Sequence, residues 1–163
     1  MSLTLVASER LASADPRLPG TDPRLAEYHA RAATLDWMNR DAVVAYQVGA
    51  WRLLAGSRHA FDEALVRSIA GADFDRAPDL RTAFNHATLQ DAHGWIDRRE
   101  GIRVPVLIIH GTEDPVLPYP HALALQRALP HATLLTLDGT GHELPRGDWP
   151  AIIQALELHT SSN

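Results

Sequence analysis

Two residues in this sequence, Asp114 and His142, have the side chains and the setting that acid–base chemistry requires. Asp114 follows the apolar run VPVLII at 104–109, and His142 closes the Gly-rich loop GTGH at 139–142, after a second apolar run. An imidazole can take the proton of a hydroxyl nucleophile, and a carboxylate on its other nitrogen fixes the tautomer and stabilises the imidazolium. The two residues can therefore activate a nucleophile if the fold brings their loops together.

The apolar runs before these residues predict the strands that position them. A continuous run rich in branched residues, as at 104–109, is typical of a parallel strand buried on both faces. Shorter runs at Ser2–Ala7 and Thr133–Leu137 predict two further strands. Sheets of α/β proteins place their functional groups beyond the carboxyl ends of parallel strands, which is where Asp114 and His142 would lie. The pattern therefore favours the α/β class.

Helical signals fill the stretch between the first two predicted strands. Asp22 can cap a first helix and Asn39 or Asp41 a second, whereas Gly56 and Gly71 are expected to end the second and third helices. The second helix would bury one apolar stripe, made of Val43, Val44, Val48, Trp51, Leu54 and Ala55. The third would bury Phe61, Leu65 and Ile69, and shorter helices are expected at Pro78–His86 and Asp91–Arg99.

The amount of helix in this stretch suggests an insertion. About 75 helical residues are far more than one crossover between parallel strands requires. We therefore interpret residues 15–100 as a helical cap over the carboxyl edge of the sheet. Residues 1–14 would supply the first core strand and its loop, and residues 101–163 the carboxyl-terminal core, all within one domain. The core would include a helix at His121–Leu129 and a last helix that Asp148 caps, with a buried face of Ile152, Ile153 and Leu156.

Composition sets outer limits on the function. With 163 residues, 45% hydrophobic and 21% charged, the chain has the composition of one soluble globular domain. Its net charge of −5 argues against a nucleic-acid partner. The amino-terminal MSLTLVASER has no basic region, and its apolar stretch is too short for a signal peptide or membrane span. The sequence therefore predicts a cytoplasmic protein with no membrane partner.

Neither a metal nor another cofactor is expected. The chain has no cysteine, which excludes disulfides, thiolate metal sites and a cysteine nucleophile. Histidine is frequent, but His110, His121, His131 and His142 are ten or eleven residues apart, a spacing that suits no local ligand set.

The order of these parts resembles the carboxyl-terminal half of the α/β-hydrolase fold. The likeness is carried by Ser2–Ser8, by Val104–Pro118 with its HG-x-x-D motif, and by Leu134–Pro145 with its G-x-G-H motif. It implies a partial hydrolase fold, with the last three strands of the sheet and an inserted helical cap. It also implies that Asp114 is the acid and His142 the base of a Ser-Asp-His triad. The implied activity is esterase-like or lipase-like hydrolysis of a small apolar carboxylic ester.

One part of the family pattern is missing. The family carries its nucleophile on a G-x-S-x-G elbow, and this sequence has none. Gly56-Ser57 comes closest, but it is interpreted as the turn after a helix. We therefore expect a truncated chain that is inactive without a nucleophile from a missing amino-terminal half or a second copy of itself. A non-catalytic complementation partner is the alternative, and an aspartate nucleophile would instead imply an epoxide hydrolase or dehalogenase.

Three residues are candidates for the wall of a substrate pocket. Val116 and Leu117 directly follow the predicted acid, and Trp51 lies in the predicted cap. Ordinary core packing remains open for the tryptophan. Glu113 competes with Asp114 for the role of the acid, although the HG-x-x-D spacing favours Asp114.

Overall fold

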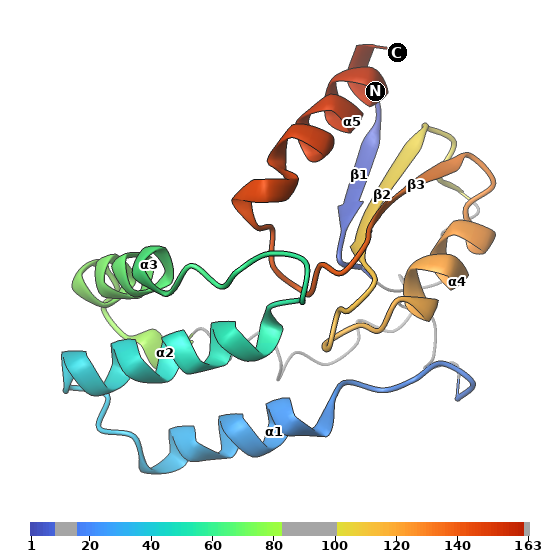
Figure 1. The fold of residues 1–163 in the computed structure, drawn as a ribbon. Helices are drawn as coiled ribbons and strands as arrows, with labels where there is room; N and C mark the ends of the chain where they lie inside the picture. Colours follow the sequence, from blue (N-terminus) through green and yellow to red (C-terminus); the bar gives the residue numbers. More distant parts are fainter. Residues whose placement is uncertain (9–15, 83–100, 162–163) are drawn as a thin grey trace. The chain divides into compact units, whose positions relative to one another are not determined.

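The computed structural model describes residues 1–8, 16–82 and 101–161, and the chain forms two compact units (Figure 1). The sheet unit contains Met1–Thr21, Leu54–His59 and Ala92–Asn163. The helical unit contains Asp22–Leu53 and Ala60–Asp91. The chain therefore returns to the sheet unit for a short segment between two helical stretches, which the sequence interpretation did not anticipate.

Three parallel strands in the order β1-β2-β3 form the sheet of the described residues. They are β1 (Leu3–Val6), β2 (Val106–Gly111) and β3 (Ala132–Leu137). Every residue of β2 is buried, which confirms the prediction of a strand covered on both faces. Pro105, which has no amide proton, lies just before β2, where its carbonyl accepts a hydrogen bond from the amide of Leu3 at 3.0 Å.

The two faces of β2 pack against different helices. Val106 and Ile108 contact the apolar side of α4 (Pro120–Ala128), through residues such as Leu125. Leu107 and Ile109 belong to a second cluster that includes Ile152 of α5 (Trp149–Ser161). Because successive side chains of a strand point to opposite faces, one apolar run fills both clusters. Figure 1 shows α4 and α5 on either side of the sheet, as the predicted α/β fold requires.

Side chains cap the helices of the helical unit, as predicted for Asp22 and Asn39. Asp22 accepts a hydrogen bond from the amide of Arg24 at 2.8 Å and starts α1 (Pro23–Ala30), which continues into the 3₁₀ turn η1 (Arg31–Thr34). Asn39 accepts from the amide of Ala42 at 3.1 Å at the start of α2 (Arg40–Leu54). Asp62 caps α3 (Glu63–Arg76), accepting from the amide of Leu65 at 2.9 Å. Val44 and Val48 of α2 pack against Ala70 of α3.

Several details of the predicted helices are wrong. Gly71 does not end the third helix: it lies buried inside α3, where a Cβ would come within 2.7 Å of the Arg40 guanidinium. The predicted apolar faces are also displaced, because Trp51, Ile69 and Ile153 are exposed by 40%, 44% and 51%. Spacing alone does not decide which side of a helix meets its neighbour.

Two further predictions fall partly or wholly outside the described residues. Within Pro78–His86, Leu80–Thr82 form a short 3₁₀ turn, and the rest of that range from residue 83 on is not described. The helix predicted at Asp91–Arg99 lies entirely outside the described residues. The interpretation of residues 15–100 as a cap over the sheet stays a prediction.

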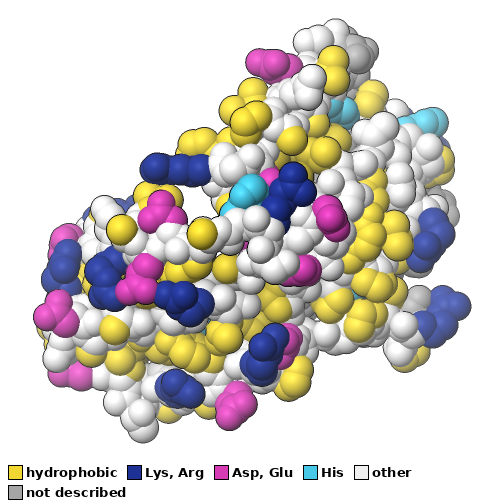
Figure 2. All heavy atoms as spheres, viewed as in Figure 1, with side chains coloured by type: hydrophobic (Ala, Val, Ile, Leu, Met, Phe, Trp, Pro, Cys, Tyr) yellow, Lys and Arg dark blue, Asp and Glu magenta, His cyan; other side chains and the backbone are white. Residues whose placement is uncertain are grey.

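Charges on the face shown in Figure 2 are intermixed, with basic and acidic side chains side by side over α2 and α3. Arg40 pairs with Asp75 at 2.8 Å, and Glu63 pairs with both Arg52 and Arg67. Across the described ranges, no helix combines the length and apolar character that crossing a membrane needs.

Candidate active site

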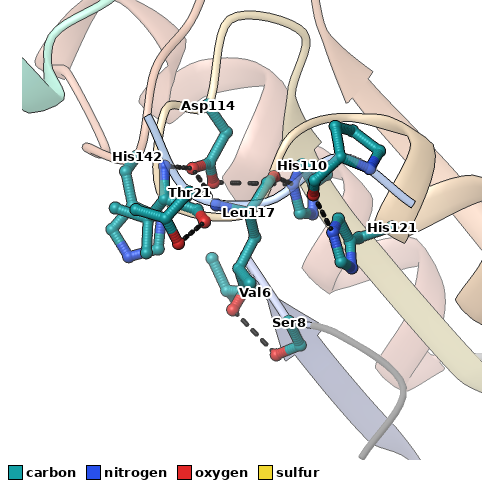
Figure 3. A network of polar contacts seen from close by, with 10 residues as sticks. Val6, Ser8, Thr21, His110, Asp114, Leu117, His121 and His142 are labelled. Atoms are coloured by element: carbon teal, nitrogen blue, oxygen red, sulfur yellow. Dashed lines mark hydrogen bonds and ion pairs between the residues drawn. The ribbon is translucent and has the colours of Figure 1, made fainter. Parts of the chain in front are cut away.

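Asp114 and His142, which the sequence singled out, form a hydrogen bond at the carboxyl ends of β2 and β3 (Figure 3). The Nδ1 of His142 lies 2.8 Å from Oδ2 of Asp114. The carboxylate is fully buried, whereas the imidazole side chain is 28% exposed. With Nδ1 engaged by the carboxylate, Nε2 is the ring nitrogen left for proton exchange.

The second oxygen of Asp114 is held by backbone amides. Val116 and Leu117 each donate an N–H to Oδ1 at 2.8 Å. Burial raises the pKa of Asp114, but the hydrogen bonds from His142, Leu117 and Val116 outweigh it and bring the pKa below its ordinary value. The carboxylate therefore stays ionised at neutral pH. Val116 and Leu117 thus hold the acid through their backbone, and a role of their side chains in a pocket stays a prediction.

His110 supports the same loop from inside the sheet, a role that the sequence interpretation missed. Its side chain is fully buried, and Nε2 donates to the carbonyl of Leu117 at 2.8 Å. The same nitrogen lies 3.5 Å from Oδ2 of Asp114. Since a carbonyl only accepts, Nε2 carries the proton here. His110 therefore fixes the turn whose amides bind the acid.

Direct backbone contacts join the two loops. The amide of Thr112 donates to the carbonyl of Leu137 at 3.0 Å, and that of Glu113 donates to Thr140 at 2.9 Å. Gly139 has a positive φ of 68°, which a side chain would disfavour, and its amide donates to the hydroxyl of Thr112 at 2.8 Å. A Cβ on Gly111 would overlap the carbonyl oxygen of Thr140, so the loops meet where glycine is required.

The segment Leu54–His59 adds a third set of contacts. The amide of His142 donates to the carbonyl of Leu54 at 2.8 Å, and the amide of Gly56 donates to the Glu143 carboxylate at 2.9 Å. Ser57 donates to Glu113 twice, from its amide at 2.8 Å and from its hydroxyl at 2.7 Å. The carboxylate of Glu113 is thus engaged by Ser57, and the imidazole of His142 binds Asp114.

Asp148 forms a second buried acid–histidine contact at the other end of this segment. Thr140 donates its hydroxyl to Oδ2 at 2.5 Å, and Nε2 of His59 lies 2.9 Å from Oδ1. Burial raises the pKa of Asp148, but the hydrogen bonds from Thr140 and His59 and the charge of Arg58 bring it below its ordinary value. The sequence predicted Asp148 only as a helix cap. It did not predict the contact with His59, because the two residues are far apart in the chain.

Trp51 lies on α2 in the helical unit, and its place in a pocket wall stays a prediction. Two serine hydroxyls of the sheet unit have hydrogen-bond partners other than His142. Ser8 donates its hydroxyl to the carbonyl of Val6 at 3.0 Å, and the hydroxyl of Ser57 is engaged by Glu113 (Figure 3 for Ser8). Among the residues that the structure describes, no group of three or more His, Asp or Glu side chains could hold a metal ion.

Comparisons with known proteins agree with this architecture. A family model of α/β hydrolases, described as TAP-like protein, matches residues 86–157. Alpha/beta hydrolase domain-containing protein 17C of Xenopus tropicalis is 45% identical over 66 residues, which make up 40% of this chain and 20% of that protein. The esterase RhEst1 from Rhodococcus sp. ECU1013 superposes with a TM-score of 0.67 at 15% identity, covering 99% of this chain and 56% of that one. The chain is therefore similar to α/β hydrolases, in fold over almost its whole length and in sequence over residues 86–157.

A second solved structure shows the same α/β-hydrolase fold. It is the 2-hydroxy-6-oxo-6-phenylhexa-2,4-dienoate hydrolase of Rhodococcus sp. strain RHA1, with a TM-score of 0.60 at 21% identity. The superposition covers 98% of this chain and 55% of that enzyme. The chain therefore spans about half the length of the similar solved structures and about a fifth of the curated relative. The superfamily resemblance predicted from the two motifs is confirmed.

Proposed function

We propose that this chain supplies the acid and the base of a Ser-Asp-His triad that hydrolyses carboxylic esters. The observation that carries the proposal is the 2.8 Å contact between Nδ1 of the partly exposed His142 and the buried carboxylate of Asp114. The esterase among the similar structures supports the choice of ester chemistry. We expect a small apolar ester as the substrate, with Val116, Leu117 and Trp51 as candidates for the pocket wall.

In this proposal, Nε2 of His142 carries the proton in each step of the reaction. Nε2 takes the proton of the serine hydroxyl as its oxygen attacks the ester carbonyl, and then gives that proton to the leaving alkoxide. Water attacks the acyl-enzyme in the same way, with Nε2 again accepting and returning the proton. Asp114 holds the other proton on Nδ1 and stabilises the imidazolium, since its own lowered pKa keeps it ionised.

The nucleophile and the oxyanion donors come from elsewhere in this proposal. The hydroxyls of Ser8 and Ser57 are engaged by Val6 and Glu113, so neither is poised on the imidazole. An oxyanion donor is worth about 3–4 kcal/mol, so a chain without donors loses activity even if a hydroxyl is supplied. An aspartate in place of the serine would turn the same pair toward epoxide-hydrolase or dehalogenase chemistry.

Ester turnover tests the proposal. The longest reading frame that contains this chain is expressed, and hydrolysis of 4-nitrophenyl butyrate is followed with the parent, with His142→Ala and with Asp114→Asn. We expect each substitution to lower kcat/KM by roughly 10⁴-fold. The exposed His131→Ala is the matched control and should leave turnover unchanged. Turnover that is unaffected by His142→Ala would remove the triad from consideration.

A binding role is the second candidate function. Within the described sheet, β1 pairs with β2 alone, and Val6 at its end is 39% exposed. A strand edge with free backbone groups can pair with another strand, which would be a complementing polypeptide or a second copy of this chain. The binding role would be favoured if the protein expressed from the longest reading frame binds such a partner but hydrolyses no ester.

A further inference from the structure

The segment Leu54–Ser57 binds both loops of the Asp114–His142 pair, and does so through the residues next to the pair. Glu113, just before Asp114, accepts from the amide and hydroxyl of Ser57 at 2.8 and 2.7 Å. Glu143, just after His142, accepts from the amide of Gly56 at 2.9 Å. Each of these carboxylates is thus fixed by the segment one residue away from a member of the pair.

Glycine makes this close approach possible. A Cβ on Gly56 would overlap the carbonyl oxygen of Gly139 and lie 2.6 Å from the amide nitrogen of Gly141. A Cβ on Gly141 would overlap the carbonyl oxygen of Leu54. Real Cβ atoms do not come so near to backbone, so the segment and the His142 loop pack backbone against backbone. Such a contact transmits small displacements directly, because no flexible side chain lies between.

The segment continues into a second attachment. The amide of Arg58 donates to the carbonyl of Gly139 at 2.9 Å, and His59 binds Asp148, which in turn accepts from Thr140. The loop that carries His142 is therefore attached before and after its histidine, whereas the loop that carries Asp114 is attached through Glu113.

We propose that Leu54–Ser57 is a clamp that sets the hydrogen bond between Asp114 and His142, and that Glu113 and Glu143 are its positioning residues. Neither glutamate touches the reacting atoms: each fixes its neighbour by accepting amide protons of the clamp. Removing one carboxylate frees its loop and leaves a backbone amide without its acceptor. The importance of the clamp for catalysis rests on the proposed function. Its effect on the hydrogen bond between Asp114 and His142 can be measured whether or not the protein hydrolyses esters.

The tautomer of His142 reports on this hydrogen bond without any need for turnover. At alkaline pH, where imidazoles are neutral, a carboxylate partner keeps the proton on Nδ1, whereas a free histidine prefers it on Nε2. Imidazole ¹⁵N chemical shifts distinguish the two forms. The variants are Glu113→Ala, Glu143→Ala and the double Glu113→Ala/Glu143→Ala, and the exposed Glu157→Ala on α5 is the matched control. Thermal melts verify that each variant is folded, and the two single variants carry the test if the double variant unfolds.

We expect the parent and Glu157→Ala to hold the proton mainly on Nδ1, and the clamp variants to shift it toward Nε2. Folded clamp variants with the parent tautomer would overturn the proposal, as would a parent without preference for Nδ1. A clamp that behaves as expected in a protein without ester turnover would leave the inference standing and the proposed function refuted. If turnover depends on His142 but the tautomer does not respond to either glutamate, the proposed function stands and the clamp is refuted.

Discussion

The amide of His142 donates to the carbonyl of Leu54 at 2.8 Å, so the proposed base is held by its backbone as well as by its ring. The ring is bound to Asp114 and the backbone to Leu54, the last residue of α2. Both contacts lie within the sheet unit. The position of the imidazole therefore depends on a segment that carries no candidate catalytic residue.

Gly56→Ala tests how tightly that segment is packed. The new Cβ would overlap the carbonyl oxygen of Gly139, and backbone cannot move aside as a flexible side chain can. We expect the free energy of unfolding, measured by urea denaturation, to fall by about 1–3 kcal/mol. Gly20→Ala is the control, because a Cβ there meets no atom within 4 Å. Equal effects of the two substitutions would contradict the close approach described for Gly56.

Acid stability should depend on Asp114. Its pKa is lowered in the folded state, so its contribution to stability is complete above the ordinary aspartate pKa of about 3.9 and is lost as the pH falls through the folded-state pKa. Asp114→Asn removes this contribution. We expect the variant to be less stable than the parent at pH 7 and to lose less stability on acidification, as denaturation curves across the acid range would show. A parent and variant with parallel pH profiles would refute the assignment.

Because β2 is buried on both faces, shortening one of its side chains should lower the free energy of unfolding strongly. Ile108 is fully buried between β1, β3 and α4, so Ile108→Ala should lower the free energy of unfolding by about 2–5 kcal/mol. The matched control is Ile153→Ala, since Ile153 is 51% exposed on α5. We expect the control to change stability by roughly 0.5 kcal/mol or less. Chemical denaturation measures both, and a control as costly as Ile108→Ala would show that α5 buries a different face.

Self-association through β1 is the prediction attached to the second candidate function. The purified chain should sediment as oligomers, and Val6→Arg should shift it toward the monomer because a charge disfavours strand pairing at an edge. Ile153→Arg places the same charge on an exposed apolar position of α5 and should leave the distribution unchanged. A parent that sediments as a single monomeric species would exclude a role for β1 in pairing two copies.

The features that could be predicted from the sequence are those with a local signal or a strong hydrophobic pattern. The apolar run at 104–109 predicted β2 because branched residues without polar interruption suit a strand covered on both faces. Asp114 and His142 could be paired because each follows such a run, and parallel strands bring their carboxyl ends to one edge. Asp22 and Asn39 cap helices through amides two or three residues away, so their role is readable locally.

What the sequence missed depends on contacts between distant segments. Gly56 lies just past the end of α2, as predicted, but its close approach to Gly139 and Gly141 was missed. Asp148 binds His59 across a separation of 89 residues, and no periodicity announces such a pair. Gly71 was wrongly predicted to stop α3, because a glycine buried under Arg40 has the same sequence signal as a helix end.

The return of the chain at Leu54–His59 has a consequence for how this protein can change length in evolution. The helical unit consists of two pieces, Asp22–Leu53 and Ala60–Asp91, and each leaves and re-enters the sheet unit separately. Insertions or deletions in either piece need not disturb the other, whereas a single residue added within Leu54–Ser57 would displace hydrogen bonds to the loops that carry Asp114 and His142. We therefore expect homologous chains to differ in the length of either helical piece and to keep the spacing between them constant.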